Sequence, residues 1–230
     1  MRVVFVPGFT QTSESWRGVI DTLSAGIEAE ALDIPPGHDW SETAHRLAEA
    51  GGGGTWVGYS MGGRLALQVA LDRPDLVDAL VLVSATAGLR SESEAATRRA
   101  SDAALAQRIE SIGVAAFLVE WLAQPMFERV PTDAPGVTER GRWSAAELAG
   151  VLRALGTGSM PNLWPRLSEL ELPITIVTGI HDPKFSAIGD ELAAACVNSS
   201  VTRISVDAGH AIPLERPDFL RGLLTPTDPP

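Results

Sequence analysis

The stretch Gly-Tyr-Ser-Met-Gly at residues 58–62 makes Ser60 a candidate nucleophile or base. It matches the G-x-S-x-G pattern and lies between an apolar run and a segment with helical periodicity. A sharp strand-to-helix turn there would expose the Ser60 hydroxyl, and the N-terminus of the following helix would place N–H groups behind a developing oxyanion. The alternative is a Gly/Ser turn that only joins a strand to a helix.

A serine hydroxyl needs a base, and the chain offers four histidines: His38, His45, His181 and His210. His210 follows the last predicted strand, so its loop would run over the edge of the sheet where Ser60 emerges. We therefore predict His210 as the base, against a merely structural loop histidine. His45 lies in a polar helical pattern, His38 follows a turn, and His181 directly precedes an aspartate.

The third member should orient the imidazole. Asp182 follows the predicted strand at 173–179, on the same edge of the sheet, and we prefer it to Asp207. Asp207 is only three residues from His210, a separation that rarely lets a carboxylate reach the imidazole. The chain order is then Ser60, Asp182, His210, as in G-x-S-x-G hydrolases.

An oxyanion hole requires two N–H donors, and we predict those of Met61 and Phe9. Met61 follows the serine, and Phe9 lies in the loop after the first strand, where Gly8 allows a close turn. Phe9 can equally be an ordinary aromatic residue that lines a pocket.

Alternation of predicted strands and helices indicates the fold that positions these residues: an α/β fold with a mostly parallel sheet, helices on both faces and a helical insert over the strand ends. Short Val- and Ile-rich runs predict strands at 2–6, 55–59, 79–85, 173–179 and 201–208. Helical periodicity covers 62–73, 91–124 and 143–156, with Gly156 as a helix end. We predict a core of residues 1–87 and 166–230 and a lid of residues 88–165.

Arg64 lies four residues after Ser60, on the same face of the predicted helix. A guanidinium beside a nucleophile is suited to holding a carboxylate, whereas a neutral ester has little use for it. The alternative is a structural arginine that bridges the helix and the lid.

Composition excludes several partners. With 230 residues and a formal net charge of −11, the chain lacks the basic character that nucleic acid or an anionic membrane requires. The single cysteine, Cys196, forms no internal disulfide, and Cys/His metal-ligand spacing is absent. Neither a signal-peptide core nor a membrane-spanning run is present, so we expect a cytoplasmic protein, monomeric or a small homo-oligomer.

The chain as a whole resembles the α/β-hydrolase-fold proteins. More narrowly, it resembles the menaquinone-pathway synthases that make 2-succinyl-6-hydroxy-2,4-cyclohexadiene-1-carboxylate. The stretches that carry this resemblance span nearly the full length: GYSMGGRLAL, SATAGLR, ATRRASD, FLVEWLAQPMF, LGTGSMPNLWPRL and HDPKF. The first is common among hydrolases, whereas the lid stretches and DPKF are far more specific.

The resemblance implies a lyase that eliminates pyruvate from a polycarboxylate and needs neither a metal nor an organic cofactor. The serine, polarised by its histidine, removes a ring proton. Motif match assigns substrate contacts to a set of residues, with Arg142 as a rival for the last: Tyr59, Arg64, Arg98, Trp121 and Arg140. The family usually has His-Gly-Phe in its oxyanion loop, where this chain has Pro-Gly-Phe at 7–9.

Two alternatives follow from the same residues, because a fold alone does not fix a function. A small-molecule esterase or carbon–carbon bond hydrolase would have an apolar pocket with Arg64 turned away from Ser60. A binding protein without turnover would have lid residues that block Ser60.

Overall fold

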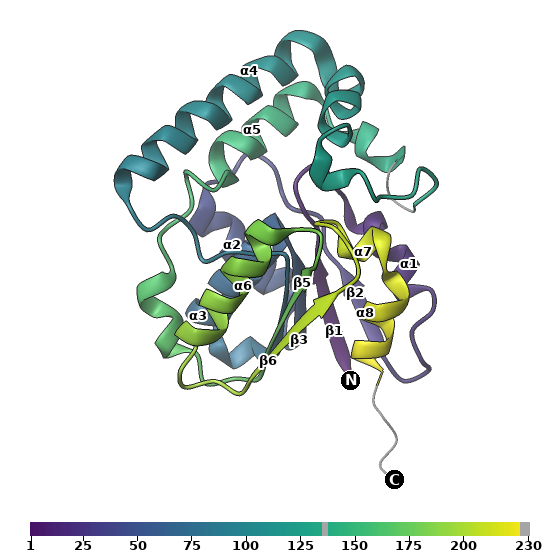
Figure 1. Ribbon diagram of the computed structural model, residues 1–230, viewed down its shortest axis with the longest axis vertical. Coiled ribbons are helices and arrows are strands. Elements are labelled where there is room, and N and C mark those ends of the chain that lie inside the picture. The colour runs from purple at the N-terminus through teal and green to yellow at the C-terminus, as the bar shows by residue number, and fades with distance from the viewer. Residues whose placement is uncertain (135–137, 226–230) are drawn as a thin grey trace.

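Six parallel strands form one sheet in the computed structural model, which describes residues 1–134 and 138–225 (Figure 1). Its strand order is β2-β1-β3-β4-β5-β6, so all the carboxyl ends meet at one edge. The strands are β1 (Arg2–Val6), β2 (Glu28–Ala31), β3 (Gly54–Tyr59), β4 (Val77–Val83), β5 (Ile174–Gly179) and β6 (Val201–Val206). The predicted fold class is therefore confirmed, and five of the six strands match predicted ones.

The missed strand, β2, lies at the edge of the sheet beside β1. Its sequence is Glu-Ala-Glu-Ala, and the two glutamates are exposed while the alanines are half-buried. Ala and Glu are poor strand formers, so no Val- or Ile-rich signal marks it. An edge strand pairs with only one other strand and can leave one of its faces in water. The polar segment β2 can therefore join the sheet through β1 while its glutamates stay exposed.

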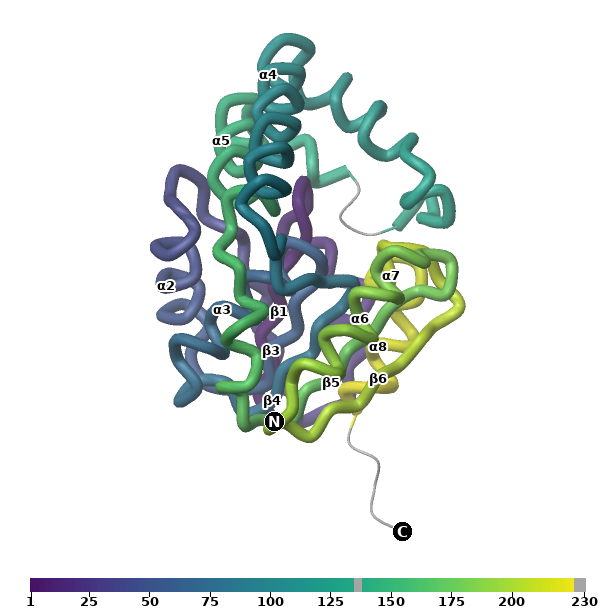
Figure 2. Tube along the Cα trace, turned by 60° about the vertical axis from the view of Figure 1, so that its left-hand side comes forward, coloured from purple at the N-terminus to yellow at the C-terminus, as the bar shows by residue number. Residues whose placement is uncertain are grey.

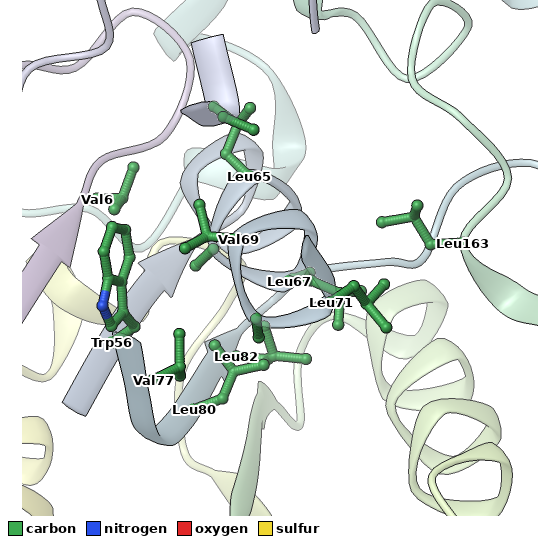
Figure 3. Close-up of a cluster of buried hydrophobic side chains, with 14 of the residues drawn as sticks. Val6, Trp56, Leu65, Leu67, Val69, Leu71, Val77, Leu80, Leu82 and Leu163 are labelled. Atoms are coloured by element: carbon green, nitrogen blue, oxygen red, sulfur yellow. The ribbon is translucent and has the colours of Figure 1, made fainter. Parts of the chain in front are cut away.

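Helices cover both faces of the sheet. Side chains that alternate along each strand feed two cores, with Trp56 and Leu82 on one face and Val57 and Val83 on the other. Figure 3 shows the first core, where leucines of α3 meet side chains of β3 and β4. The first face carries α2 (Trp40–Gly51), α3 (Met61–Asp72) and α6 (Pro183–Ala195), and the second carries α1 (Arg17–Ile20), α7 (Ile212–Glu215) and α8 (Pro217–Leu224).

The segment between β4 and β5 forms a helical lid beyond the carboxyl edge, opposite the N-terminus (Figures 1 and 2). Its main helices are α4 (Glu92–Leu122) and α5 (Ala145–Leu155), which share a small core of their own. Short 3₁₀ helices are η1 (Ser13–Trp16), η2 (Pro74–Leu76), η3 (Pro125–Phe127), η4 (Thr138–Arg142) and η5 (Trp164–Glu169). Within 88–134 and 138–165 no strand is present. The domain boundaries stay a prediction, and their residues 135–137 and 226–230 lie outside those described.

The base of the lid is closed by hydrogen bonds between its two ends. The N–H of Leu163 donates to the carbonyl of Ala87 at 2.8 Å, and the indole N–H of Trp164 donates to the carbonyl of Gly88 at 2.9 Å. Because β4 and β5 are neighbours in the sheet, the chain leaves and returns at adjacent positions.

Two glycines shape the lid. Gly113 interrupts the helix predicted at 91–124 with a φ of 79°, so α4 is two helical pieces joined at a kink. Gly156 ends α5 as predicted, although its φ of −58° needs no glycine. A glycine is required here because there is no space for a side chain: a Cβ at residue 156 would come within 2.3 Å of a carboxylate oxygen of Asp102.

Candidate active site

Ser60 lies in the turn between β3 and α3 with a φ of 51°, in the left-handed region. Its N–H donates to the carbonyl of Val83 at 2.9 Å, which fixes the turn against β4. A Cβ at Gly58 would come within 2.5 Å of the Gly62 carbonyl, and one at Gly62 within 2.2 Å of the Val6 carbonyl. The glycines therefore permit the close approach that exposes the serine.

Ser60, His210 and Asp182 meet at the carboxyl edge of the sheet. His210 Nε2 is 3.2 Å from Ser60 Oγ, and His210 Nδ1 is 2.6 Å from Asp182 Oδ2. The second oxygen of Asp182 accepts the N–H of Phe185 at 3.3 Å. With Asp182 fixing the tautomer, His210 can accept the Ser60 proton.

The other histidines and the rival aspartate lie elsewhere. Asp207 bonds His181 Nε2 at 2.9 Å, away from the His210 ring. His45 is exposed near Glu49 on α2. The geometry thus brings together the three predicted residues, Ser60, Asp182 and His210.

The imidazole of His210 is only 2% exposed and is enclosed by aromatic rings. Ring centroids lie 4.5 Å away for Phe185, 5.5 Å for Tyr59 and 6.4 Å for Phe127. Burial raises the pKa of the Tyr59 hydroxyl well above its ordinary value. This environment excludes water from the histidine and strengthens its bond to Asp182.

A cavity of about 430 Å³ opens above Ser60, between the strand ends and the lid. Apart from Asp182, all the predicted site residues line it: Phe9, Tyr59, Ser60, Met61, Arg64, Arg98, Trp121, Arg140 and His210. Residues that the sequence analysis did not single out also line it, among them Gln11, Thr86, Asp102 and Lys184. Lys184 lies within the stretch DPKF, which was the signal available for it.

The two predicted oxyanion-hole residues, Phe9 and Met61, line the same cavity as Ser60. Met61 is the first residue of α3, where the N–H has no partner within the helix. Phe9 follows Gly8, whose N–H donates to the side chain of Gln11 at 3.1 Å and so fixes the loop. The Phe9 ring packs edge-on against Trp121 with centroids 5.3 Å apart, so Phe9 is a lining aromatic as well.

Arg64 reaches both the cavity and the lid. Its Nη1 donates to the Leu155 carbonyl at 3.0 Å, and its guanidinium lies 5.7 Å from the Trp40 ring centroid. Burial lowers the pKa of Arg64 to about 9, helped by the charge of Arg98. The position of Arg64 is therefore compatible with both interpretations, carboxylate binding and a structural bridge to the lid, because the side chain lines the cavity and also bonds α5.

Arg140, not Arg142, lines the cavity. Arg140 is 1% exposed, and its Nη1 donates to Thr10 Oγ1 at 2.8 Å. Its Nε and Nη2 have no hydrogen-bond partner in the described part of the chain. Burial lowers the pKa of Arg140. Arg142 is exposed, with Asp33 at 3.9 Å.

Arg98 and Trp121 complete the lid side of the cavity. Arg98 Nε donates to Asp102 Oδ1 at 2.8 Å, while the other oxygen of this buried aspartate has no partner among residues 1–134 and 138–225. The indole N–H of Trp121 is also buried and unpartnered there. Three side chains of the lid thus present unsatisfied polar groups, and anionic or polar ligand atoms are suited to pair with the donors.

Residues 1–134 and 138–225 hold no group of three or more His, Cys, Asp or Glu side chains placed to bind a metal ion. No helix among them is both long and apolar enough to span a membrane.

Comparison with known proteins gives matches over most of the chain. A profile described as "Alpha/beta hydrolase family" matches residues 3–223. A Bacillus subtilis protein named a putative 2-succinyl-6-hydroxy-2,4-cyclohexadiene-1-carboxylate synthase is 38% identical over 166 residues, which span 70% of this chain and 60% of that protein. An Escherichia coli (O1:K1 / APEC) protein named 2-succinyl-6-hydroxy-2,4-cyclohexadiene-1-carboxylate synthase is 29% identical over 231 residues, 94% of this chain and 88% of its own.

Solved structures also match this chain over nearly its full length. The structure of MenH from S. aureus superposes with a TM-score of 0.85 at 29% identity, covering 97% of this chain and 91% of that one. An enol-lactonase from Burkholderia xenovorans LB400 gives a TM-score of 0.74 at 18% identity over 97% of this chain and 89% of its own, a likeness of fold alone.

Proposed function

Because the chain belongs to the alpha/beta hydrolase family, we propose a specific reaction on that fold. The protein eliminates pyruvate from 2-succinyl-5-enolpyruvyl-6-hydroxy-3-cyclohexene-1-carboxylate, as a carbon–oxygen lyase. One observation carries the proposal: the cavity above Ser60 holds the buried guanidinium of Arg140 with two unpartnered nitrogens. The names of the Bacillus subtilis and Escherichia coli relatives support the same reaction.

In the proposed mechanism, Ser60 and His210 act together as the base. His210 accepts the Ser60 proton as the serine oxygen takes a proton from a ring carbon, and Asp182 stabilises the imidazolium. The electron pair of the broken C–H bond forms a new ring double bond, the existing ring double bond shifts by one position toward the enolpyruvyl group, and the C–O bond to that group breaks with its electron pair leaving on oxygen. The released enolate takes up a proton and becomes pyruvate. No covalent enzyme intermediate is required.

Negative charge develops beside the succinyl carbonyl during proton removal. The proposal assigns the stabilisation of this charge to the N–H groups of Phe9 and Met61, because both residues line the cavity. Preorganised donors of this kind lower the barrier most in a site closed to water.

The cavity cations match the substrate's carboxylates. In the proposal Arg140, Arg64 and Arg98 bind carboxylates, with Tyr59 and Trp121 as further contacts. Arg140 is the strongest candidate because its unpartnered N–H groups gain partners only when a ligand binds. Arg98 is a weaker candidate because its guanidinium already pairs with Asp102.

The test is pyruvate release from this substrate, coupled to lactate dehydrogenase and NADH oxidation. The parent chain is expected to release pyruvate, and Ser60→Ala to abolish it. Ser24→Ala, an exposed loop serine, is the matched control. No release above background from the folded parent contradicts the proposal.

Ester hydrolysis is the second candidate, because the same three residues suit an acyl-enzyme route. Hydrolysis of p-nitrophenyl acetate through Ser60, together with no pyruvate release, favours ester hydrolysis.

Cytoplasmic location and a monomeric or small homo-oligomeric state are also part of the proposal. Cell fractionation tests the location, and light scattering tests the oligomeric state.

A further inference from the structure

The loop that carries His210 is held by a carboxylate outside the cavity. Glu215, at the end of α7, has only 3% of its side-chain surface exposed. One of its oxygens accepts the N–H of Gly209 at 2.6 Å, and the other accepts the N–H of Ala211 at 3.0 Å. The two donors are the residues on either side of His210, so one carboxylate brackets the histidine.

Glu215 and Asp182 therefore restrain different parts of the same residue. Asp182 bonds the imidazole ring, whereas Glu215 bonds the backbone from which the ring extends. His210 Nε2 lies 3.2 Å from Ser60 Oγ while both restraints are in place. A displacement of the backbone would move the ring even with the Asp182 bond intact.

A buried carboxylate is costly to desolvate, so its retention needs compensation. The two N–H bonds are charge-assisted and give that compensation. Without an acceptor both N–H groups would be left unpaired, and the loop would shift to satisfy them. Packing is tight at this point, because a Cβ at Gly209 would lie 3.1 Å from Glu215 Oε1 and 3.5 Å from the Met126 carbonyl.

The lid adds a weaker contact from the other side. Arg129, just after η3, places Nε 3.8 Å from Glu215 Oε2 and Nη2 3.5 Å from Asp207 Oδ1. About half of the Arg129 side chain is exposed, so its contribution is smaller than that of the backbone bonds. Glu215 itself does not line the cavity in the described structure.

We infer that Glu215 is a positioning residue for His210, which acts by accepting the two N–H groups that flank the histidine. Its role in turnover rests on the proposed function, whereas its effect on the His210 ring does not. Removal of this acceptor lowers the rate of the proton-transfer step and leaves substrate affinity unchanged.

The test compares the parent with Glu215→Ala and Glu215→Gln, using the full chain. Glu215→Gln is the conservative variant, because its amide oxygen can still accept one of the two N–H groups. Asp207→Asn is the matched control, since this exposed carboxylate lies on the same loop and bonds no backbone N–H there. Thermal unfolding selects variants that stay folded.

Two readouts are measured on folded protein. The first is pyruvate release, where kcat is expected to fall about 10- to 100-fold in Glu215→Ala and less in Glu215→Gln, with KM within about twofold. The second is the downfield ¹H NMR resonance of the His210 Nδ1 proton in its bond to Asp182, assigned by its loss in His210→Ala. This resonance is expected to shift or broaden in both Glu215 variants and to remain in Asp207→Asn.

The outcomes separate the two proposals. Retention of the parental resonance and kcat in both Glu215 variants overturns the positioning role. If the parent releases no pyruvate while the resonance still changes on substitution, the proposed function fails and the positioning role stands.

Discussion

The two halves of the cavity differ in how their polar groups are satisfied. On the core side, Ser60, His210 and Asp182 bond one another and the backbone. On the lid side, buried polar atoms of Asp102, Trp121 and Arg140 have no partner in the described part of the chain. The two halves face the same space.

This difference separates chemistry from recognition. Under the proposed function, the hydrogen bonds of the core side preorganise it for proton transfer before any ligand enters, which is the condition for electrostatic catalysis. The lid side carries a desolvation cost that only a ligand of matching polarity offsets. We therefore expect core substitutions to act on turnover and lid substitutions to act on binding, with opposite consequences for stability.

The largest effect is expected at the core. Ser60→Ala removes the group that bonds His210, so kcat for pyruvate release should fall by more than about 1,000-fold. Binding of the substrate, measured by calorimetry on this inactive variant, should stay within about threefold of the parental KM. A variant that retains a tenth of the parental kcat would contradict the core half of the comparison.

Arg140→Met probes the lid half. Loss of a charged, buried donor should lower kcat/KM about 100-fold, which corresponds to about 2–3 kcal/mol. The free energy of unfolding should rise by about 1 kcal/mol, because a buried charge with unpartnered N–H groups is removed. Steady-state kinetics and urea unfolding measure the two quantities.

Arg142→Met is the control for that variant, since Arg142 is exposed and outside the cavity. It should leave both quantities unchanged. A fall in stability for Arg140→Met would show that the guanidinium is already satisfied without ligand.

Arg64 lines the cavity from α3 and bonds a carbonyl of the lid helix α5, so it contacts both the core side and the lid side. Measurements at different pH separate its role as a charged ligand contact from its structural role. Arg64→Met should lower kcat/KM about tenfold at pH 7, where the arginine is charged. Because burial lowers the pKa of Arg64 to about 9, the ratio of parental to variant kcat/KM should shrink as pH rises through 9.

The charge of Arg64 affects stability in the opposite direction, because the charge that favours substrate binding lowers the free energy of unfolding. The pKa of Arg64 in the folded chain lies below its ordinary value, so the unfolded chain binds more protons above pH 9. The destabilising contribution of Arg64 is therefore complete below pH 9 and is relieved above it. Urea unfolding of the parent and Arg64→Met at pH 7 and pH 10 checks this.

The smallest effect is expected at the kink of α4. Gly113→Ala forces a residue with a Cβ into a φ of 79° and should lower the free energy of unfolding by about 1 kcal/mol. Gly150→Ala, within α5 and with open space for a Cβ, should raise it by about 0.5–1 kcal/mol. Both should keep kcat within about twofold, measured by pyruvate release, because neither residue touches the cavity.

The core side was the more predictable half. Each of its residues follows a strand, so strand positions placed Ser60, Asp182 and His210 at one edge before any contact was known. The edge strand β2 was missed because its four residues alternate Glu and Ala. The sequence also gave no sign that Glu215 reaches back to the His210 loop.

The lid side depends on contacts between distant segments. Arg64 bonds the carbonyl of Leu155, 91 residues away, which helical spacing does not reveal. The choice between Arg140 and Arg142 is decided by burial, because one 3₁₀ helix carries both. The Arg98–Asp102 pair is an exception, since its spacing of four residues was a usable signal.

The closed base of the lid bears on how such proteins diversify. Its two ends are joined by the Leu163–Ala87 hydrogen bond, and the strands before and after the lid, β4 and β5, are neighbours in the sheet. A recombination event with junctions near 87 and 163 would exchange the whole insert and leave every strand pairing in place. New ligand preferences can then arise by replacement of the whole insert, while Ser60, Asp182 and His210, which lie outside it, are inherited unchanged.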